Sequence, residues 1–148
     1  MSERALREIY LKGFQTCIRE SQPLALMTSY NLVNGIHTSE SRALTHDYLR
    51  CECGFSGIVM TDWVLPLKNR GTRWPIARAG RVAKAGGNLF MPGSKRDLND
   101  ILKALASGEL NRRQLQQNAS QLVRVAKVLA GGEQSDFQEI RPDGDADV

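Results

Sequence analysis

The residue best placed for chemistry in this 148-residue chain is Asp62. It follows a short apolar run that begins at Gly57, and Trp63 comes directly after it. A carboxylate at the end of a buried strand can act as a nucleophile, an acid or a base, and the neighbouring ring could stack on a sugar. An aspartate after a strand is more often a turn or helix-capping residue, so the surrounding sequence has to decide between these interpretations.

The other polar residues offer less chemistry. His37 and His46 have no partner at a spacing typical of a site, so we expect structural roles for both, with His46 exposed on a helix beside Asp47. Glu52 falls at the end of a predicted helix, on the opposite side of the sheet from Asp62. It is therefore assigned no catalytic role.

The three cysteines, Cys17, Cys51 and Cys53, are an odd number without a paired framework. A Cys-x-Cys pair with no second ligand pair is weak evidence for a metal, so we expect no metal site, reduced thiols and a cytoplasmic location. Residues 143–147 are superficially similar to a calcium loop, but no glutamate closes it.

Two more apolar runs accompany the one before Asp62. Residues 24–29 lead into a polar loop at 30–35, and residues 88–91 lead into Pro92 and Gly93. Short apolar runs that are each followed by a loop and a helical pattern are typical of successive βα units. In a parallel α/β barrel such loops lie together on the C-terminal face, where active sites form.

Apolar residues at three- and four-residue spacing predict the helices that flank these runs. The predicted helices cover residues 2–20, with Ser2 as N-cap, 42–51, ended by Gly54, then 75–85, 97–107 and 112–129. The residues expected to face inward are Leu6, Ile9, Tyr10, Phe14, Cys17, Ile18, Leu44, Tyr48, Leu49, Leu98, Ile101, Leu102, Leu105, Leu115, Leu122, Val125 and Leu129.

Three segments, 27–35, 49–63 and 89–93, together resemble glycoside hydrolase family 3, the β-glucosidase family. Their order and separation also fit, and the resemblance covers roughly residues 2–130. It implies an α/β fold: a partial (β/α)8 or TIM-type barrel of about the last three βα units, with a C-terminal helical pair. A complete barrel needs about 250 residues, so this chain is a fragment or takes its missing units from another polypeptide.

The resemblance also implies retaining hydrolysis of a β-linked glucoside or oligosaccharide, without a cofactor. Asp62 would be the nucleophile, and a second carboxyl group about 5 Å away would act as acid and then base. Trp63 would form part of the sugar pocket, Tyr30 would lie within hydrogen-bonding reach of Asp62, and Met27 would contact the sugar. Asn34 and Gly35, like Asn31, are expected to hold the loop rather than to touch substrate.

Several parts of the family pattern are missing. The family's Lys-His pair, its sugar-binding Asp and Arg and its acid/base residue come from regions that this sequence does not contain. Cys53 stands where the family usually has Trp, and Asn88 stands where an Asp is common. We therefore expect a chain that is inactive or weakly active alone. The alternative is a non-catalytic interaction module or split-barrel subunit, which self-associates or binds a partner chain that supplies the missing strands.

Composition limits other functions. Hydrophobic residues make up 41% of the chain, yet no apolar stretch approaches the ~20 residues of a membrane span, and the charged first 20 residues do not form a signal peptide. Eight Lys or Arg residues and no acid lie between Trp63 and Arg96, but they are dispersed, so we expect a solvated surface and no nucleic-acid binding. Residues 133–148, with six acids and one arginine, are expected to be a disordered tail that follows a domain at 1–132.

Overall fold

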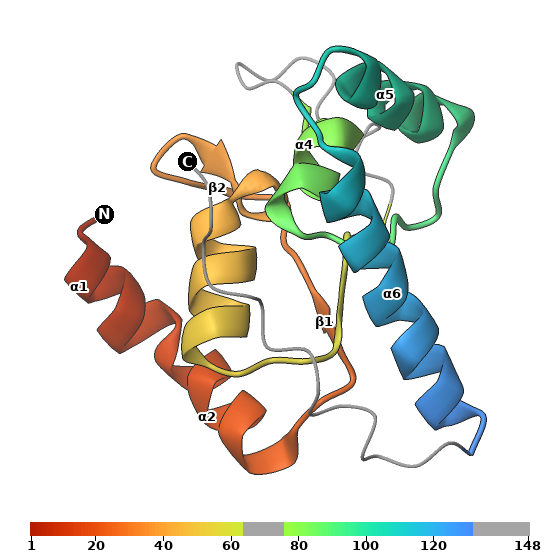
Figure 1. The fold of residues 1–148 in the computed structure, drawn as a ribbon. Coiled ribbons are helices and arrows are strands. Elements are labelled where there is room, and N and C mark those ends of the chain that lie inside the picture. Colours follow the sequence, from red (N-terminus) through yellow and green to blue (C-terminus); the bar gives the residue numbers. More distant parts are fainter. Residues whose placement is uncertain (64–75, 132–148) are drawn as a thin grey trace.

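The computed structural model describes residues 1–63 and 76–131, and its centre is a small parallel sheet (Figure 1). Strand β1 (Ala25–Met27) pairs in parallel with β4 (Ile58–Met60), with Leu26 opposite Val59. Leu89 adds a parallel bridge to Met60 on the other side of β4. The three apolar runs of the sequence are thus neighbours in the order in which they occur along the chain.

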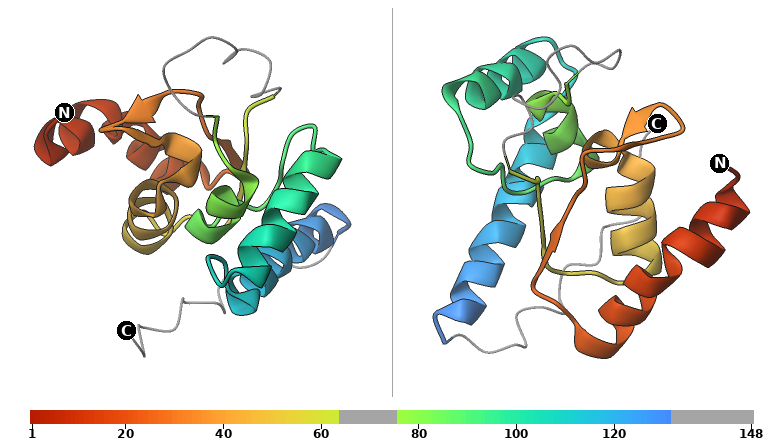
Figure 2. Two further views of the ribbon diagram at one scale, coloured as in Figure 1. Left: turned by 90° about the horizontal axis from the view of Figure 1, so that it is seen from above. Right: turned by 180° about the vertical axis from the view of Figure 1, so that it is seen from behind.

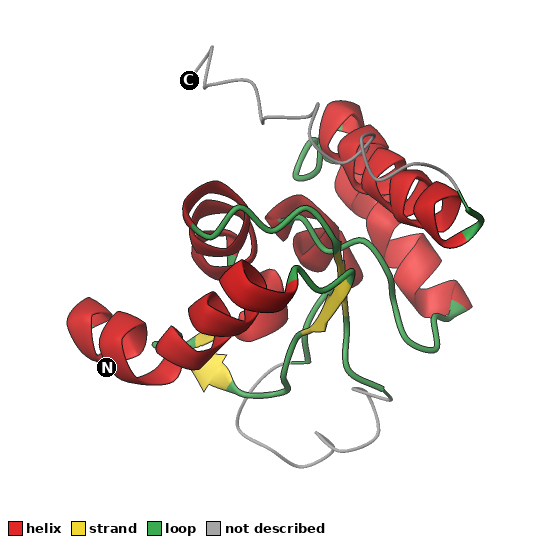
Figure 3. Ribbon diagram, turned by 90° about the horizontal axis from the view of Figure 1, so that it is seen from below, coloured by secondary structure: helices red, strands yellow, loops and turns green. Residues whose placement is uncertain are grey.

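Side chains alternate between the two faces of this sheet, as the period of a strand requires. Leu26 and Val59 face a hydrophobic cluster with Ile18, Tyr48 and Leu49. The helices that carry these residues lie on one side of the strands, in an arc that continues through α4 and α6 (Figure 2). Figure 3 shows the short strands at the inner side of this arc.

The N-terminal helical segment comprises α1 (Glu3–Ala5), η1 (Leu6–Tyr10) and α2 (Lys12–Ser21). Ser2 caps it as predicted, because its hydroxyl accepts a hydrogen bond from the backbone N–H of Ala5 at 3.2 Å. Its buried face is narrower than the sequence indicated. Ile18 is buried and Leu11 partly so, whereas Ile9, Tyr10 and Phe14, all predicted to face inward, are exposed.

A short hairpin follows β1. Its strands are β2 (Leu32–Val33) and β3 (Ile36–His37), which pair antiparallel. Asn34 and Gly35 form the turn between them with φ angles of 51° and 85°. Asn and Gly are the residues that adopt such positive angles most readily in a two-residue hairpin turn, so both hold the loop as predicted. The turn η2 (Thr38–Glu40) leads from the hairpin to the next helix.

Helix η3 (Ala43–Glu52) is a π-helix that ends before Gly54, whose φ is 71°. Tyr48 and Leu49 are buried in it, as predicted. The prediction that His46 has no partner is wrong. Its Nδ1 lies 2.9 Å from Oδ1 of Asp47 and 3.8 Å from Sγ of Cys51, and its side chain is 21% exposed. The neighbouring turns of the π-helix bring these side chains together.

The C-terminal half contains α4 (Ala79–Ala85), α5 (Lys95–Ala106) and α6 (Arg112–Leu129). Gly86, with φ of 102°, ends α4 as predicted. A second cluster is formed by Ala83, Ala104 and Leu110, with Phe90 and other side chains packed against it. Leu98, Leu102 and Leu129 were predicted to face inward, but they are more than half exposed. Within the described residues, the rest of the fold packs against only one face of each of these helices. The predicted acidic tail at 133–148 and three predicted surface cations, Lys68, Arg70 and Arg73, lie outside the described residues.

Candidate active site

The loops that follow β1, β4 and the bridging residue Leu89 meet at one edge of the sheet, as the sequence predicted. The backbone N–H of Thr28, just after β1, donates to the carbonyl oxygen of Met60 at 2.9 Å. The N–H of Thr61, just after β4, donates to the carbonyl oxygen of Leu89 at 2.9 Å. These bonds fix where each segment ends relative to its neighbour along the strand direction. The residues after Met27, Met60 and Leu89 therefore lie together at one edge of the sheet, which we call the rim.

Asp62 lies on this rim and is partly buried. Its Oδ1 accepts a hydrogen bond from the backbone N–H of Trp63 at 2.7 Å. A hydrogen bond from a backbone donor to a carboxylate oxygen limits the rotation of the side chain. The bond thus holds Asp62 in one orientation on the rim.

Tyr30 reaches Asp62 from the neighbouring loop. Its hydroxyl donates a hydrogen bond to the carbonyl oxygen of Trp63 and also lies within hydrogen-bonding reach of the Asp62 carboxylate. Desolvation raises the pKa of the Tyr30 hydroxyl, and the interaction with the negative charge of Asp62 raises it further. A phenol has one proton to donate, so the Trp63 carbonyl oxygen and the Asp62 carboxylate share the single donor of Tyr30. The raised pKa keeps this hydroxyl protonated at neutral pH.

Met27 and Trp63 are the other two predicted site residues. Met27 ends β1 opposite Met60 and is 45% exposed, on the face of the sheet turned away from the helices. Trp63 is 51% exposed. The structure therefore brings Tyr30, Asp62 and Trp63 into one group, while Met27 lies at the end of the adjacent strand β1.

Thr61 is a residue of this rim that the sequence reasoning did not identify. Its side chain is 3% exposed, and its hydroxyl accepts a hydrogen bond from the backbone N–H of Met91 at 2.9 Å. The bond ties the turn at Pro92 and Gly93 to the strand end that carries Asp62. A buried threonine at the last position of an apolar run, one residue before a carboxylate, is the signal that could have pointed to it.

A buried polar network supports the strands from the helix side. Asn88 accepts hydrogen bonds through Oδ1 from the backbone N–H of Val59 at 2.7 Å and from the Arg50 guanidinium at 2.8 Å. Its Nδ2 donates to the carbonyl oxygen of Asn118 at 3.0 Å and to Oε1 of Gln121 at 2.7 Å. One side chain thus joins η3, β4 and α6.

Arg50 is the charged member of this network. Its guanidinium also donates to the carbonyl oxygen of Gly57 at 2.9 Å. Burial is the main influence on its pKa, which falls to about 10, and the nearby positive charge of Arg124 lowers it further. The group therefore keeps its charge at neutral pH. Within the described residues, its hydrogen bonds run to three carbonyl oxygens and to the amide oxygen of Asn88.

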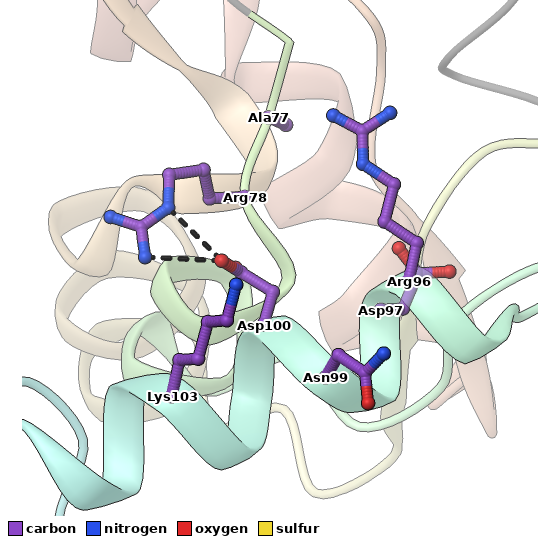
Figure 4. A pocket seen from close by; sticks show the side chains of 7 residues that line it. All are labelled: Ala77, Arg78, Arg96, Asp97, Asn99, Asp100 and Lys103. Carbon is purple, nitrogen blue, oxygen red and sulfur yellow. Dashed lines mark hydrogen bonds and ion pairs between the residues drawn. The ribbon is translucent and has the colours of Figure 1, made fainter.

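A cavity of about 410 Å³ lies apart from the predicted site residues. It is bounded by the start of α4 and one face of α5, and Figure 4 shows the side chains of Ala77, Arg78, Arg96, Asp97, Asn99, Asp100 and Lys103 around it. Asp100 accepts from the Arg78 guanidinium at 3.1 Å and from the backbone N–H of Gly80 at 2.9 Å. These contacts fix the start of α4.

The described parts of the chain contain neither a cluster of metal ligands nor a membrane-spanning helix. Within residues 1–63 and 76–131, no group of three or more His, Cys, Asp or Glu side chains could hold a metal ion. In the same residues no helix is long and apolar enough to cross a bilayer.

Glu52, at the end of η3, forms an ion pair with Arg7 and not with a group of the rim.

Known proteins similar to this chain include β-glucosidases. Beta-glucosidase B of Emericella nidulans is 39% identical over 131 residues, which is 87% of this chain and 14% of that protein. β-Glucosidase 3B from Thermotoga neapolitana, solved in complex with glycerol, aligns with a TM-score of 0.73 and 31% identity over 91% of this chain and 19% of its own.

A GH3 β-glucosidase of Bifidobacterium adolescentis aligns with a TM-score of 0.71 and 34% identity over 100% of this chain and 19% of its own. The chain thus spans about one seventh of the length of the first curated relative, which is 14% covered. The family model for the glycosyl hydrolase family 3 N terminal domain matches residues 1–125. The resemblance carried by the strand ends is confirmed: this chain belongs to glycosyl hydrolase family 3.

Proposed function

We propose that this chain forms about the last three βα units of a (β/α)8 barrel in a β-glucosidase-like retaining hydrolase, with Asp62 as nucleophile. The observation that carries the proposal is the shared rim of β1, β4 and Leu89, on which Tyr30, Asp62 and Trp63 meet. In parallel α/β barrels, catalytic residues come from the C-terminal ends of several strands. The β-glucosidase names of the relatives support the same reaction class.

In this proposal, Asp62 attacks the anomeric carbon and forms a covalent glycosyl-enzyme, while the aglycone leaves with a proton from a second carboxyl group. Water then attacks the same carbon, releases the sugar and returns Asp62 to its ionised form. The hydrogen bond from the Trp63 N–H suits this role, because it restricts the rotation of the carboxylate that has to face the anomeric carbon.

The remaining predicted residues would bind the sugar. The exposed ring of Trp63 offers an apolar face for the sugar to pack on, and Met27 offers an apolar contact from the adjacent strand. Tyr30 would position Asp62 through its single donated proton. The second carboxyl group and the other sugar contacts would come from parts of the enzyme beyond this chain, which covers a small share of its relatives.

We further infer that activity requires association with the rest of the barrel. A separate polypeptide would supply the missing units, or they would belong to a longer polypeptide that includes this sequence. The exposed side chains of Leu98 and Leu102 favour this view, because they lie one turn apart on the same face of α5 and neighbouring exposed apolar groups can mark an interface. Ile9 and Phe14 are likewise exposed on the N-terminal helical segment. A non-catalytic module that associates in the same way remains the competing function.

Aryl β-glucoside hydrolysis distinguishes these functions. The full chain would be assayed alone and together with the remainder of the Ruminococcus albus β-glucosidase, which is 37% identical over 124 residues. We expect turnover only in the mixture, and an Asp62→Asn variant should lose at least about 1,000-fold. Glu20→Gln, an exposed carboxylate on α2, is the matched control and should keep full activity.

Two results would count against the proposal. Turnover that survives Asp62→Asn in an otherwise active mixture would remove Asp62 from the chemistry. A stable mixture that binds, judged by light scattering, but never hydrolyses a glucoside would favour the interaction module instead.

A further inference from the structure

The π-helix η3 places a thiol beside an imidazole on the outer side of the fold. Sγ of Cys51 lies 3.8 Å from Nδ1 of His46, and the same nitrogen lies 2.9 Å from Oδ1 of Asp47. Cys51 is exposed, whereas Tyr48 and Leu49 of the same helix are buried against the core. The pair is therefore open to small molecules on a surface that the proposed sugar site does not use.

The hydrogen bond to Asp47 fixes which ring nitrogen carries the proton. An ionised carboxylate can only accept, so Nδ1 of His46 must be the donor. The same N–H then lies within reach of the Cys51 sulfur, and it can donate to a thiolate there but cannot take up the proton of the thiol. A hydrogen bond given to the charged form favours the thiolate.

Charged groups of both signs lie near the thiol, and arginines accompany the carboxylates. Arg50, the next residue back along η3, has a favourable charge interaction with the Cys51 thiolate. The carboxylate of Asp47 opposes it, but that charge is shared with Arg42, whose Nε lies 3.6 Å away. The carboxylate of Glu52 is engaged by Arg7 on η1. Arg124 adds a further positive charge close to Arg50.

We propose that Cys51 is a reactive thiol that forms mixed disulfides with small disulfides, with His46 as the hydrogen-bond donor that stabilises its thiolate. In the reaction, the Cys51 sulfur attacks one sulfur of the small disulfide and the S–S bond breaks. The second sulfur leaves as a thiolate and takes a proton from solvent, which restores the proton that Cys51 lost. The exchange needs no oxidant other than the disulfide itself.

The chain contains its own controls. Cys17 is exposed on α2, and no described residue forms a hydrogen bond with its thiol. Cys53 is 8% exposed and packs in the cluster with Tyr48 and Phe55. Reactivity can therefore be compared between an exposed thiol with an imidazole, an exposed thiol without one and a buried thiol, all within one molecule.

The test treats the full chain with glutathione disulfide and follows each cysteine-containing peptide by mass spectrometry between pH 5.5 and 9. At pH 7, Cys51 should react about fivefold or more faster than Cys17, and its rate should reach half its maximum at a lower pH. In urea the three rates should converge, because the advantage depends on the fold.

His46→Asn should bring the Cys51 rate down to that of Cys17 while leaving the Cys17 rate unchanged. The comparison of Cys51 with Cys17 in the unmodified chain does not depend on how this variant folds. Equal rates for the two thiols in the native chain, or a Cys51 rate that His46→Asn leaves unchanged, would overturn the proposal.

Discussion

Tyr30 and Trp63 follow different strands, yet the hydroxyl of Tyr30 donates a hydrogen bond to the backbone carbonyl oxygen of Trp63. This bond connects the loop after β1 to the residue directly after Asp62. The position of the carboxylate thus depends on a side chain 32 residues earlier in the sequence.

Replacement of Tyr30 by Phe tests this connection. The variant keeps the ring but removes the donor, so Asp62 loses a hydrogen-bonding group near its carboxylate. In the reconstituted glucosidase we expect kcat/KM to fall by about 10- to 100-fold, the cost of one well-placed hydrogen bond to a charged group. Tyr10→Phe, at an exposed position on η1, is the control, and an equal loss in both variants would contradict a specific role for Tyr30.

Asn88 should be the most sensitive polar residue of the described fold. Asn88→Ala removes the acceptor for the Arg50 guanidinium and for the Val59 N–H, and leaves both buried groups without that partner. We expect the free energy of unfolding to fall by about 3 kcal/mol in urea titrations. The exposed Asn99 on α5 provides the comparison, since Asn99→Ala should change it by less than about 0.5 kcal/mol.

Two glycines should respond in opposite ways to alanine. A Cβ at Gly57 would lie 2.7 Å from the carbonyl carbon of Leu24, where the chain enters β1, so Gly57→Ala should cost about 2–4 kcal/mol of stability. A Cβ at Gly13 of α2 meets nothing within 4 Å, so Gly13→Ala should add up to about 1 kcal/mol. Thermal melts of the two variants should therefore shift in opposite directions.

Acid stability should depend on Asp100. Burial raises the pKa of this carboxyl group, but the hydrogen bonds from the Gly80 N–H and the Arg78 guanidinium outweigh burial and hold it below its ordinary value. A depressed carboxyl pKa stabilises the fold above the pKa of the unfolded chain, and this contribution is lost as the pH falls through the folded value.

Asp100→Asn should therefore lower stability by about 1–2 kcal/mol at pH 7 and flatten its decline between pH 5 and pH 2. Urea titrations across this pH range measure both effects. A variant with the same acid profile as the parent chain would show that Asp100 does not carry this dependence.

The positions of several helices and strands could be predicted from the sequence, whereas the partial barrel stays a prediction. The helix predicted at 112–129 has those bounds in the structure, and the three strand signals became neighbouring parallel segments. Capping residues and glycines mark such boundaries locally, so no knowledge of distant contacts is needed. The rim that carries Tyr30, Asp62 and Trp63 followed from the order of the strands.

Side-chain burial was harder to predict. Ile9, Phe14 and Leu98 lie on apolar stripes, but a stripe indicates only that some partner covers it and not where that partner lies. Arg50 and Asn88 were missed as a pair because their contact joins positions 38 residues apart, and single-chain periodicity contains no information on such contacts.

The pair of His46 and Cys51 was missed for a geometric reason. Residues five apart lie about 140° from each other around an α-helix, so they do not share a face. In a π-helix the backbone hydrogen bonds join residues five apart, so positions i and i+5 lie on neighbouring turns and the two side chains meet. A sequence scan that assumes 3.6 residues per turn cannot find this contact.

The parallel order of β1, β4 and Leu89 has a consequence for how such a chain could be exchanged between proteins. Each of these segments pairs with the next one along the sequence, so none of the described pairings requires a later segment to insert between two earlier ones. A block of this kind can be transplanted with two chain junctions. Chimeras of family members that exchange the whole block should therefore keep the register between its strands. A crossover between β1 and β4 would instead pair two strands of different origin, whose contacts would have to match along the whole pair.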